Sequence, residues 1–270
     1  MDTSIKNAEL KNKNRFLGFV DVYDQARPEM PEYPIEIITK YLNKKAGIVV
    51  DLGCGSGLST TAWKGHCDAV IGIEPSDDMF RIANNKTDKA ISFKKAFAHE
   101  TGLSSDCADV AICSQSFHWM NPELTLAEVN RILKAGGIFA TVDYDWPPVC
   151  KWEAEAAHKQ LFYKVSCLED EHKDLKDAYI RWDKNKHLSN IEKSGYFRYQ
   201  REIVFANREL CDAKRLISMT LSQSGLQSII KHKPHLIKSP LDEYVETIQR
   251  LFAGDTMEVD FCYRMRLGIK

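Results

Sequence analysis

The sequence predicts a doubly wound α/β fold, in which helices cover both faces of a mainly parallel sheet. Between residues 28 and 145, short continuous apolar runs alternate with helical patterns. Strands that are buried on both faces have unbroken apolar runs, and strands that alternate with helices belong to parallel sheets. A glycine-rich turn at Gly53, Gly55 and Gly57 also follows the first apolar run and opens the next helix. This order of strand, turn and helix is typical of a nucleotide-type ligand site at the carboxyl edge of such a sheet.

The expected elements follow one another in a regular order. Apolar spacing predicts a first helix over residues 28–41. Strands are expected at 48–52, 69–73, 91–93, 110–113 and 138–142, and helices between them at 58–64, 77–84 and 122–133. Ser76 is a favoured N-cap for the second of these helices, and Pro122 fits the first turn of the third. Gly136 and Gly137 are expected to end that third helix.

The pattern changes after Trp146. Residues 1–146 are predicted to form the ligand-binding core, 147–186 a helical lid insertion, and 187–270 the rest of the sheet. Within this last part, a strand at 198–206 is followed by a second helical insertion at about 207–254, with Asn207 as its cap. The final strand alternates between two faces. Val259, Phe261, Tyr263, Met265 and Leu267 share one face, and Glu258, Asp260, Arg264 and Arg266 share the other, so a half-exposed strand is expected.

Charge and composition exclude several function classes. The 270 residues carry 37 basic and 38 acidic side chains, so the chain has no general attraction to nucleic acid or anionic membranes. Residues 1–15 lack the apolar core of a signal peptide, and no run reaches the about 20 apolar residues that span a bilayer. A soluble, cytoplasmic protein without a metal site is expected, since no C-x-x-C pair occurs and Pro234 separates His232 from His235.

The glycine turn favours one cofactor. Leu58 stands where a dinucleotide fingerprint has its third glycine, and no Lys-Ser/Thr pair follows, so the turn is not a P-loop. A loop that begins with Asp51 and has no lysine suits a ligand with an amino group, such as S-adenosylmethionine (SAM). Glycines let the backbone approach the ligand, and the next helix offers free N–H groups to the methionine carboxylate. Asp51 is then expected to attract the methionine ammonium, directly or through water. A plain strand-to-helix turn is the structural alternative.

Glu74 supports the same cofactor. It ends the second strand, 23 residues after Asp51. An acid at that place can accept hydrogen bonds from both ribose hydroxyls. The alternative is an exposed loop acid.

Further motifs resemble a known family. Arg27-Pro28 and Tyr33-Pro34 precede the first helix, and His118-Trp119 follows the fourth strand. With the glycine turn, they make the chain similar to the class I SAM-dependent methyltransferases, and most similar to their type 11, trans-aconitate-type small-molecule subgroup. The resemblance implies a Rossmann-like seven-stranded sheet whose last strand is antiparallel.

The resemblance also implies roles for single residues. Pro75 and Met79 would pack on the adenine, with Ala98 beside the ring. Phe97 stands where many relatives have an acid that binds the adenine amino group, so His99 or a backbone carbonyl would take that contact. Tyr23 and Arg27 belong to a segment that folds over the cofactor, where Arg27 would pair with a carboxylate. The expected cofactor residues are therefore Tyr23, Arg27, Asp51, Gly53, Gly55, Gly57, Glu74, Pro75, Met79, Phe97, Ala98, His99 and Ser114.

His118 is the candidate catalytic residue. It lies beside the methyl position in this family, as a general base or as a hydrogen-bonding group that orients the acceptor. A satisfied structural histidine is the alternative. Candidates for the acceptor pocket are Trp119, Tyr144, Trp146, Arg181, Trp182, Met219 and Ser222. The sequence Asn/Asp-Pro-Pro-Tyr/Phe that amino-directed DNA methyltransferases use is absent after the fourth strand, which argues against nucleic acid.

The predicted function is in-line transfer of a methyl group from SAM to a small molecule, with a carboxylate or hydroxyl oxygen favoured. Alignment of the reactants supplies about 7–11 kcal/mol of such a reaction's barrier reduction, so no strong catalytic constellation is required. Two alternatives stay open: a SAM-binding protein without catalysis, and a nicotinamide-dependent oxidoreductase.

Overall fold

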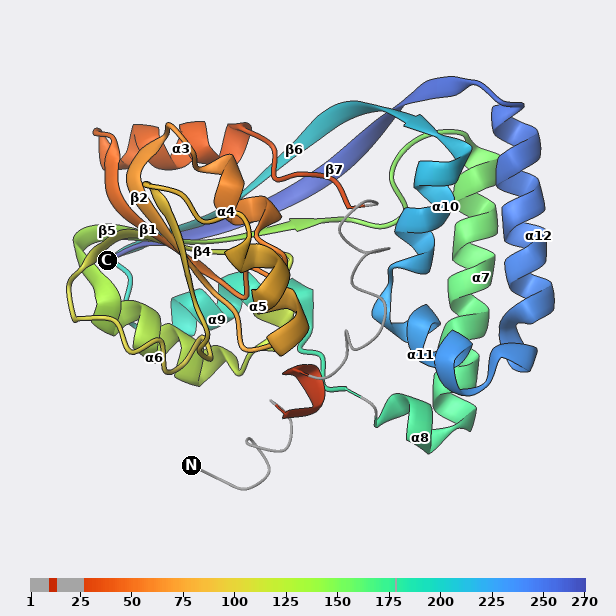
Figure 1. Cartoon of the computed structure of the whole chain (residues 1–270), viewed down its shortest axis with the longest axis horizontal. Helices are drawn as coiled ribbons and strands as arrows, with labels where there is room; N and C mark the ends of the chain where they lie inside the picture. The colour runs from red at the N-terminus through yellow and green to blue at the C-terminus, as the bar shows by residue number, and fades with distance from the viewer. Residues whose placement is uncertain (1–9, 14–26, 178) are drawn as a thin grey trace.

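The computed structural model describes residues 10–13, 27–177 and 179–270. A seven-stranded sheet occupies one end of the molecule, and a group of helices stands apart at the other end (Figure 1). Two long strands and the chain around residues 145–151 run between the two parts. None of the described helices is long and apolar enough to cross a membrane.

The sheet has the strand order β3-β2-β1-β4-β5-β7-β6. The strands are β1 (Ala46–Leu52), β2 (Cys67–Ile73), β3 (Ile91–Lys94), β4 (Ala108–Ser114), β5 (Leu133–Tyr144), β6 (Tyr199–Asp212) and β7 (Thr256–Ile269). β1 to β5 pair in parallel, and β7 pairs antiparallel with both β5 and β6. The predicted doubly wound fold with an antiparallel last strand is therefore confirmed.

Helices cover both faces of the sheet. α3 (Tyr33–Leu42) lies on one side, and α6 (Pro122–Ile132) and α9 (His187–Lys193) lie on the other (Figure 1). The alternation within β1 explains how one strand serves both layers: Val49 packs in the core cluster that contains Ile38, whereas Val50 packs in the one that contains Val129. Two short helices, α4 (Leu58–Ala62) and α5 (Asp77–Asn84), follow β1 and β2 directly.

The remaining helices form a separate unit, which we call the helical group. It comprises α7 (Trp152–Glu171), α8 (Lys173–Lys176), α10 (Ala213–Leu221), α11 (Ser224–His232) and α12 (Pro234–Phe252). Val165, Ile229 and Ile248 pack in the same apolar cluster as the α3 face of the sheet. The sheet and the helical group thus share a continuous core. The short helix η1 (Phe117–Trp119) follows β4, and η2 (Lys184–Lys186) lies on the connection from α8 to α9.

Three expectations about element ends and faces were wrong. β5 begins at Leu133, so Gly136 and Gly137 lie inside a strand rather than at a helix end. β6 continues to Asp212 because it pairs with β7 along its whole length, and Asp212, not Asn207, caps the next helix by accepting from the Arg215 N–H at 2.7 Å. The third wrong expectation was the exposure of Arg266.

Arg266 was expected on the exposed face of the last strand, but its side chain is only 3% exposed. Its Nε lies 2.7 Å from a carboxylate oxygen of Glu202, and its NH1 lies 3.5 Å from Asp143. Ion pairing makes the burial of this guanidinium tolerable. The apolar face of the same strand is as expected, since Val259 through Leu267 are buried at every second position.

Candidate functional site

Two adjoining cavities lie at the carboxyl edge of the sheet. The first, which we call the sheet-edge cleft, encloses about 1080 Å³ including its open mouth. The second, the helix-side cavity, encloses about 950 Å³ between the sheet and the helical group. Arg27, Gln115 and Trp119 line both, so the two cavities meet at these residues.

Many residues predicted from the sequence line the sheet-edge cleft. They are Arg27, Gly53, Gly55, Glu74, Pro75, Met79, Phe97, Ala98, His99, Ser114, Trp119 and Tyr144. Most of them lie at or just after the carboxyl ends of β1 to β5, whereas Arg27 precedes α3 and Met79 lies in α5. The parallel order of these strands brings their carboxyl ends together, as the doubly wound fold requires.

The glycine loop forms one wall of the cleft. Gly53 has φ +67°, and a Cβ there would lie 2.9 Å from the Cβ of Ser116, so a side chain at this position would be strained. At Gly55, also at positive φ, a Cβ would meet no atom within 4 Å. Because Gly55 lines the cleft, its missing side chain leaves space for a ligand to approach the backbone.

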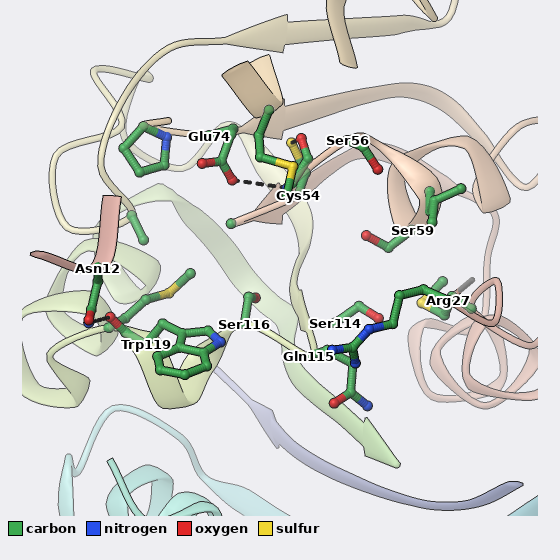
Figure 2. A pocket seen from close by; sticks show the side chains of 18 of the residues that line it. Asn12, Arg27, Cys54, Ser56, Ser59, Glu74, Ser114, Gln115, Ser116 and Trp119 are labelled. Atoms are coloured by element: carbon green, nitrogen blue, oxygen red, sulfur yellow. Dashed lines mark hydrogen bonds between the residues drawn. The ribbon is translucent and has the colours of Figure 1, made fainter. Parts of the chain in front are cut away.

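Glu74 faces the cleft from the end of β2. One carboxylate oxygen accepts from the Gly55 N–H at 3.0 Å, and the other accepts from the Ser76 N–H at 2.8 Å (Figure 2). These bonds fix the carboxylate against the glycine loop. Since a carboxylate oxygen has two lone pairs, each oxygen keeps capacity for a ligand hydroxyl.

Asp51 lies at the end of β1, as its motif indicated, and its partner Ser59 lines the cleft. Asp51 itself is fully buried and is not among the residues that line the cleft. One of its oxygens accepts from the hydroxyls of Ser59 and Thr60, each at 2.7 Å. Burial raises its pKa to about 6, although those two hydroxyls act in the opposite direction. Asp51 therefore ties the start of α4 to the end of β1.

Gly57 also lies behind the cleft lining. It precedes α4 at φ +89°, and the Phe93 ring would lie 2.9 Å from a Cβ placed there. Gly57 thus serves the turn and its packing.

Met79 and Pro75 line the far part of the cleft together with Phe97, whose ring stacks on His99 with centroids 5.6 Å apart. This part offers mainly apolar surface.

The helix-side cavity has an excess of positive charge. Arg27, Arg181 and Lys184 line it against one acid, Glu169, among the described residues. Glu169 itself accepts from the Tyr179 hydroxyl at 2.6 Å. The predicted pocket residues Trp119, Trp146 and Arg181 line this cavity, as does His118.

Arg27 stands at the border of the two cavities (Figure 2). Its guanidinium donates to the Tyr144 hydroxyl and, at 3.2 Å, to the backbone carbonyl of Ser222. It also lies 5.8 Å and 5.9 Å from the ring centres of Tyr144 and Trp146. These contacts hold a cation at the junction between the sheet and the helical group.

A buried charged cluster lies beneath the helix-side cavity. Its centre is Asp143, near the end of β5. One carboxylate oxygen lies 3.1 Å from the Lys184 ammonium and 3.5 Å from Nδ1 of His118, and the other lies 3.1 Å from Nδ1 of His187. Burial opposes ionisation of Asp143, but the Lys184 charge and the two imidazoles outweigh it and hold the pKa of Asp143 well below its usual range.

His118 is neutral at physiological pH. Burial lowers its pKa well below 6.5, and the Lys184 charge lowers it further. The carboxylate of Asp143 acts in the opposite direction but does not prevail. A neutral imidazole retains a nitrogen lone pair that can accept a proton.

Some predicted residues lie elsewhere. Met219 is fully buried in the core of the helical group, and neither it nor Trp182 nor Ser222 lines a cavity. Tyr23 lies outside the described residues. For these positions, residue type alone gave no information on which way the side chain points.

Sequence reasoning missed several site residues. Asn12 lines the cleft and donates to the backbone carbonyls of Trp119 and Ile180, each at 2.8 Å (Figure 2). Lys184 and Asp143 were missed as well, because neither lies in a recognisable motif. Gln115 lies between Ser114 and His118, which were both expected in the site, but Gln115 itself was given no role.

Part of this chain matches known methyltransferases in sequence. Residues 50–141 match the family model of a methyltransferase domain. A Saccharomyces cerevisiae protein, the probable S-adenosylmethionine-dependent methyltransferase CRG1, is 32% identical over 131 residues, which cover 46% of this chain and 45% of that protein. These two matches identify residues 50–141 as a SAM-dependent methyltransferase domain.

Two further comparisons cover at least 90% of this chain. The uncharacterized methyltransferase-like protein C25B8.10 of Schizosaccharomyces pombe is 24% identical over 259 residues, or 95% of each chain. A proposed type II methyltransferase from Anaeromyxobacter dehalogenans superposes with a TM-score of 0.68 at 20% identity, covering 90% of this chain and 97% of that one. At that identity the superposition shows a common fold.

SAM is the cofactor of this methyltransferase family, and the sheet-edge cleft fits it. The cleft offers open space at Gly55, a Glu74 carboxylate held by two backbone N–H groups, and a lining that includes Pro75 and Phe97. Within the described ranges, no cluster of three or more His, Cys, Asp or Glu side chains is arranged to hold a metal ion.

Proposed function

We propose that this methyltransferase transfers the methyl group of SAM to an oxygen of a small anionic molecule, foremost a carboxylate. SAM would occupy the sheet-edge cleft and the acceptor the helix-side cavity. The observation that carries the proposal is the charge of that cavity, which Arg27 and Arg181 line against a single acid of the described chain, Glu169, while Lys184 in the same lining pairs with the buried Asp143. Guanidinium groups bind carboxylates through paired, charge-assisted hydrogen bonds.

Methyl transfer from SAM requires the protein mainly to align the cofactor with the acceptor. Bound SAM supplies a methyl group that its sulphonium has already activated. Glu74 would hold the ribose, the glycine loop would hold the amino acid part, and the cations would hold the acceptor on the other side of the junction. Such positioning supplies about 7–11 kcal/mol. We further propose that the two insertions, about 147–186 and 207–254, act as a lid whose helices exclude water from the acceptor.

The size of the helix-side cavity also favours a small acceptor. Its space of about 950 Å³ includes open solvent at the mouth, so the enclosed part is smaller and suits a small molecule. With a net charge of −1 the chain has no general attraction to a polyanion, so we propose neither nucleic acid nor membrane lipid as the acceptor.

A hydroxyl acceptor is the second candidate, and His118 is the observation that favours it. Its neutral imidazole lines the helix-side cavity, with Asp143 3.5 Å behind it. That pairing suits a general base that takes the proton of a phenol or alcohol, a contribution of about 10²–10⁴-fold. A carboxylate needs no base. Turnover of a carboxylate in the His118→Gln variant should therefore stay within about fivefold of wild type.

The first experiment separates binding from transfer. Calorimetry with SAM and with S-adenosylhomocysteine tests the cofactor site. Transfer of tritiated methyl groups to a panel of small mono-, di- and tricarboxylic acids, phenols and amines then tests the acceptor. Binding without transfer to any panel member would favour a non-catalytic protein, and binding of neither cofactor form by folded protein would contradict the proposal.

Arg181 provides a sharper test of the anionic acceptor. It lines the helix-side cavity and not the cleft. Arg181→Met should raise the KM for the best carboxylate about tenfold or more, with cofactor affinity unchanged, because one charge-assisted contact is lost. The matched control is Arg208→Met, since Arg208 is exposed on β6 and pairs with Asp260 away from both cavities. Equal KM values for the two variants would contradict an anionic acceptor.

A further inference from the structure

Gln115 is held in an unusual backbone conformation where the two cavities meet. It follows β4 directly, and its φ is +54°, a left-handed value that a non-glycine residue adopts at an energetic cost. Its N–H is fixed by a hydrogen bond to the Val142 carbonyl at 2.9 Å. This conformation directs the side chain to the junction, across the cleft from Glu74 (Figure 2). Strained residues of this kind cluster at functional sites.

Lys184 determines which way the Gln115 amide faces. The ammonium of Lys184 donates to the side-chain oxygen of Gln115 at 3.0 Å. An ammonium has no lone pair and cannot accept, so the amide oxygen, and not its nitrogen, must point at Lys184. The Nε2 group is then directed elsewhere. It is buried and has no hydrogen-bond partner in the part of the chain that the structure describes.

A buried amide nitrogen without a partner is costly, and native proteins keep few of them. Two N–H donors are therefore available at the border of the cofactor cleft and the helix-side cavity. They can bind a ligand oxygen but repel a ligand ammonium. This chemistry matches a carboxyl group in the acceptor.

The charge balance around Gln115 also suits methyl transfer to a carboxylate. Asp143 lies 3.1 Å from the Lys184 ammonium, so the cation that holds Gln115 is already paired. In the reaction the acceptor oxygen forms a bond to the methyl carbon, the bond from carbon to sulphur breaks, and its electron pair stays on sulphur. The carboxylate thereby loses its negative charge, and no proton moves. A full cation at the reacting oxygen would stabilise the starting state more than the transition state.

We propose that the Gln115 amide binds the reacting carboxyl group of the acceptor through Nε2 and orients it toward the methyl group. Lys184 and Asp143 act through Gln115 as positioning residues. This inference rests on the proposed function, because it assigns a contact to the carboxylate acceptor of that site. Gln115 thereby becomes the residue that selects an oxygen acceptor over an amine.

Gln115→Glu tests the assignment. The variant keeps an oxygen for Lys184 but replaces the donor by a second oxygen, which repels a carboxylate. Calorimetry in the presence of S-adenosylhomocysteine would measure binding of the small mono-, di- and tricarboxylic acids of the panel, and kcat/KM would be measured for the best of them. We expect both to fall by about 30-fold or more, because a donor to a charged group is lost and a like charge is gained. Affinity for S-adenosylhomocysteine should stay within about threefold, which also shows that the variant is folded.

Gln223→Glu is the matched control. Gln223 lines the helix-side cavity from the helical group, so the same change adds the same charge on the opposite wall. A smaller loss, below about fivefold, is expected there. Gln115→Ala, which removes the donor without adding charge, should lose about tenfold.

The outcomes distinguish the two proposals. If wild-type protein binds carboxylic acids and methylates them, while Gln115→Glu matches wild type or falls no further than Gln223→Glu, the role of Gln115 is overturned and the proposed function stands. If wild-type protein with S-adenosylhomocysteine bound takes up no carboxylic acid, the carboxylate acceptor and the role of Gln115 are both overturned. A selective loss in Gln115→Glu supports both.

Discussion

The sheet-edge cleft and the helix-side cavity adjoin, yet they are built in different ways. The cleft is formed by loops at the ends of neighbouring strands, and its glycine loop and Glu74 are fixed to one another by a backbone hydrogen bond. The cavity is formed by long side chains from distant segments, such as Arg27, Phe162 and Lys184. One site depends on backbone geometry, and the other depends on which side chains the helical group brings to it.

The two sites also differ in the groups that surround their carboxylates. In the cleft the Glu74 carboxylate accepts hydrogen bonds from two backbone N–H groups. Beneath the cavity, Asp143 is surrounded by Lys184, His118, His187 and Arg266. A cofactor that is the same for the whole family suits the first arrangement, and an acceptor that differs between members suits the second.

The largest expected effect concerns the cluster beneath the cavity. Asp143→Asn leaves the Lys184 ammonium buried without its counterion, and breaking such a pair costs about 3–5 kcal/mol. Urea denaturation of the variant should show this loss in the free energy of unfolding, with an unchanged m-value.

The control for Asp143 is the double variant with Lys184→Met. Removing both charges should recover much of the lost stability, since no unpaired ammonium then remains. If Asp143→Asn unfolds at the same urea concentration as wild type, the cluster does not stabilise the junction. The two sites would then not differ in how much their charged groups contribute to stability.

The next effect concerns the cleft. Glu74→Ala removes a carboxylate that is held in place for the two ribose hydroxyls, so affinity for SAM and for S-adenosylhomocysteine should fall about 10- to 100-fold. Calorimetry measures this directly. Glu169→Ala removes the same residue type from the helix-side cavity and should leave cofactor affinity unchanged. A similar loss in both variants would mean that the two sites are not separate.

The smallest effect tests the structural role of Asp51. Its folded-state pKa is raised from 3.8 to about 6, so the stability that its proton contributes is complete below 3.8 and is lost as pH rises through about 6. Asp51→Asn removes this dependence. Without cofactor, wild type should lose about 1 kcal/mol more than the variant between pH 5 and 7. Urea denaturation at pH 5, 6 and 7 would check it, and parallel profiles would show that Asp51 is not buried as an isolated acid.

Most of the cleft was predictable because its signals are local. Gly53 and Gly55 need positive φ values, which restricts the residue type at those positions. Glu74 ends a strand that neighbours β1 in a parallel sheet, so its position relative to the glycines follows from the strand order. Asp51 was the partial exception. Its place in the motif was clear, but only the tertiary structure showed that its carboxylate is fully buried and accepts from Ser59 and Thr60.

The helix-side cavity was largely hidden from the sequence. Arg181 was expected there, but nothing in its neighbourhood indicated that Lys184 would reach Asp143 across 41 positions of sequence. Burial of Arg266 was missed for a related reason, because strand alternation gives the face of a residue but not the charged groups that cover that face.

The sequence by itself determined the fold class, the cofactor and most of the residues that line the sheet-edge cleft. These depend on apolar periodicity, on glycine conformations and on an acid at a strand end, all of which act over a few neighbouring residues. Only the tertiary structure decided how the acceptor side is built, that Asp143 balances Lys184, and that the amide nitrogen of Gln115 is left to bind a ligand. Those features arise from contacts between segments that are distant along the chain, and local patterns carry no information about such contacts.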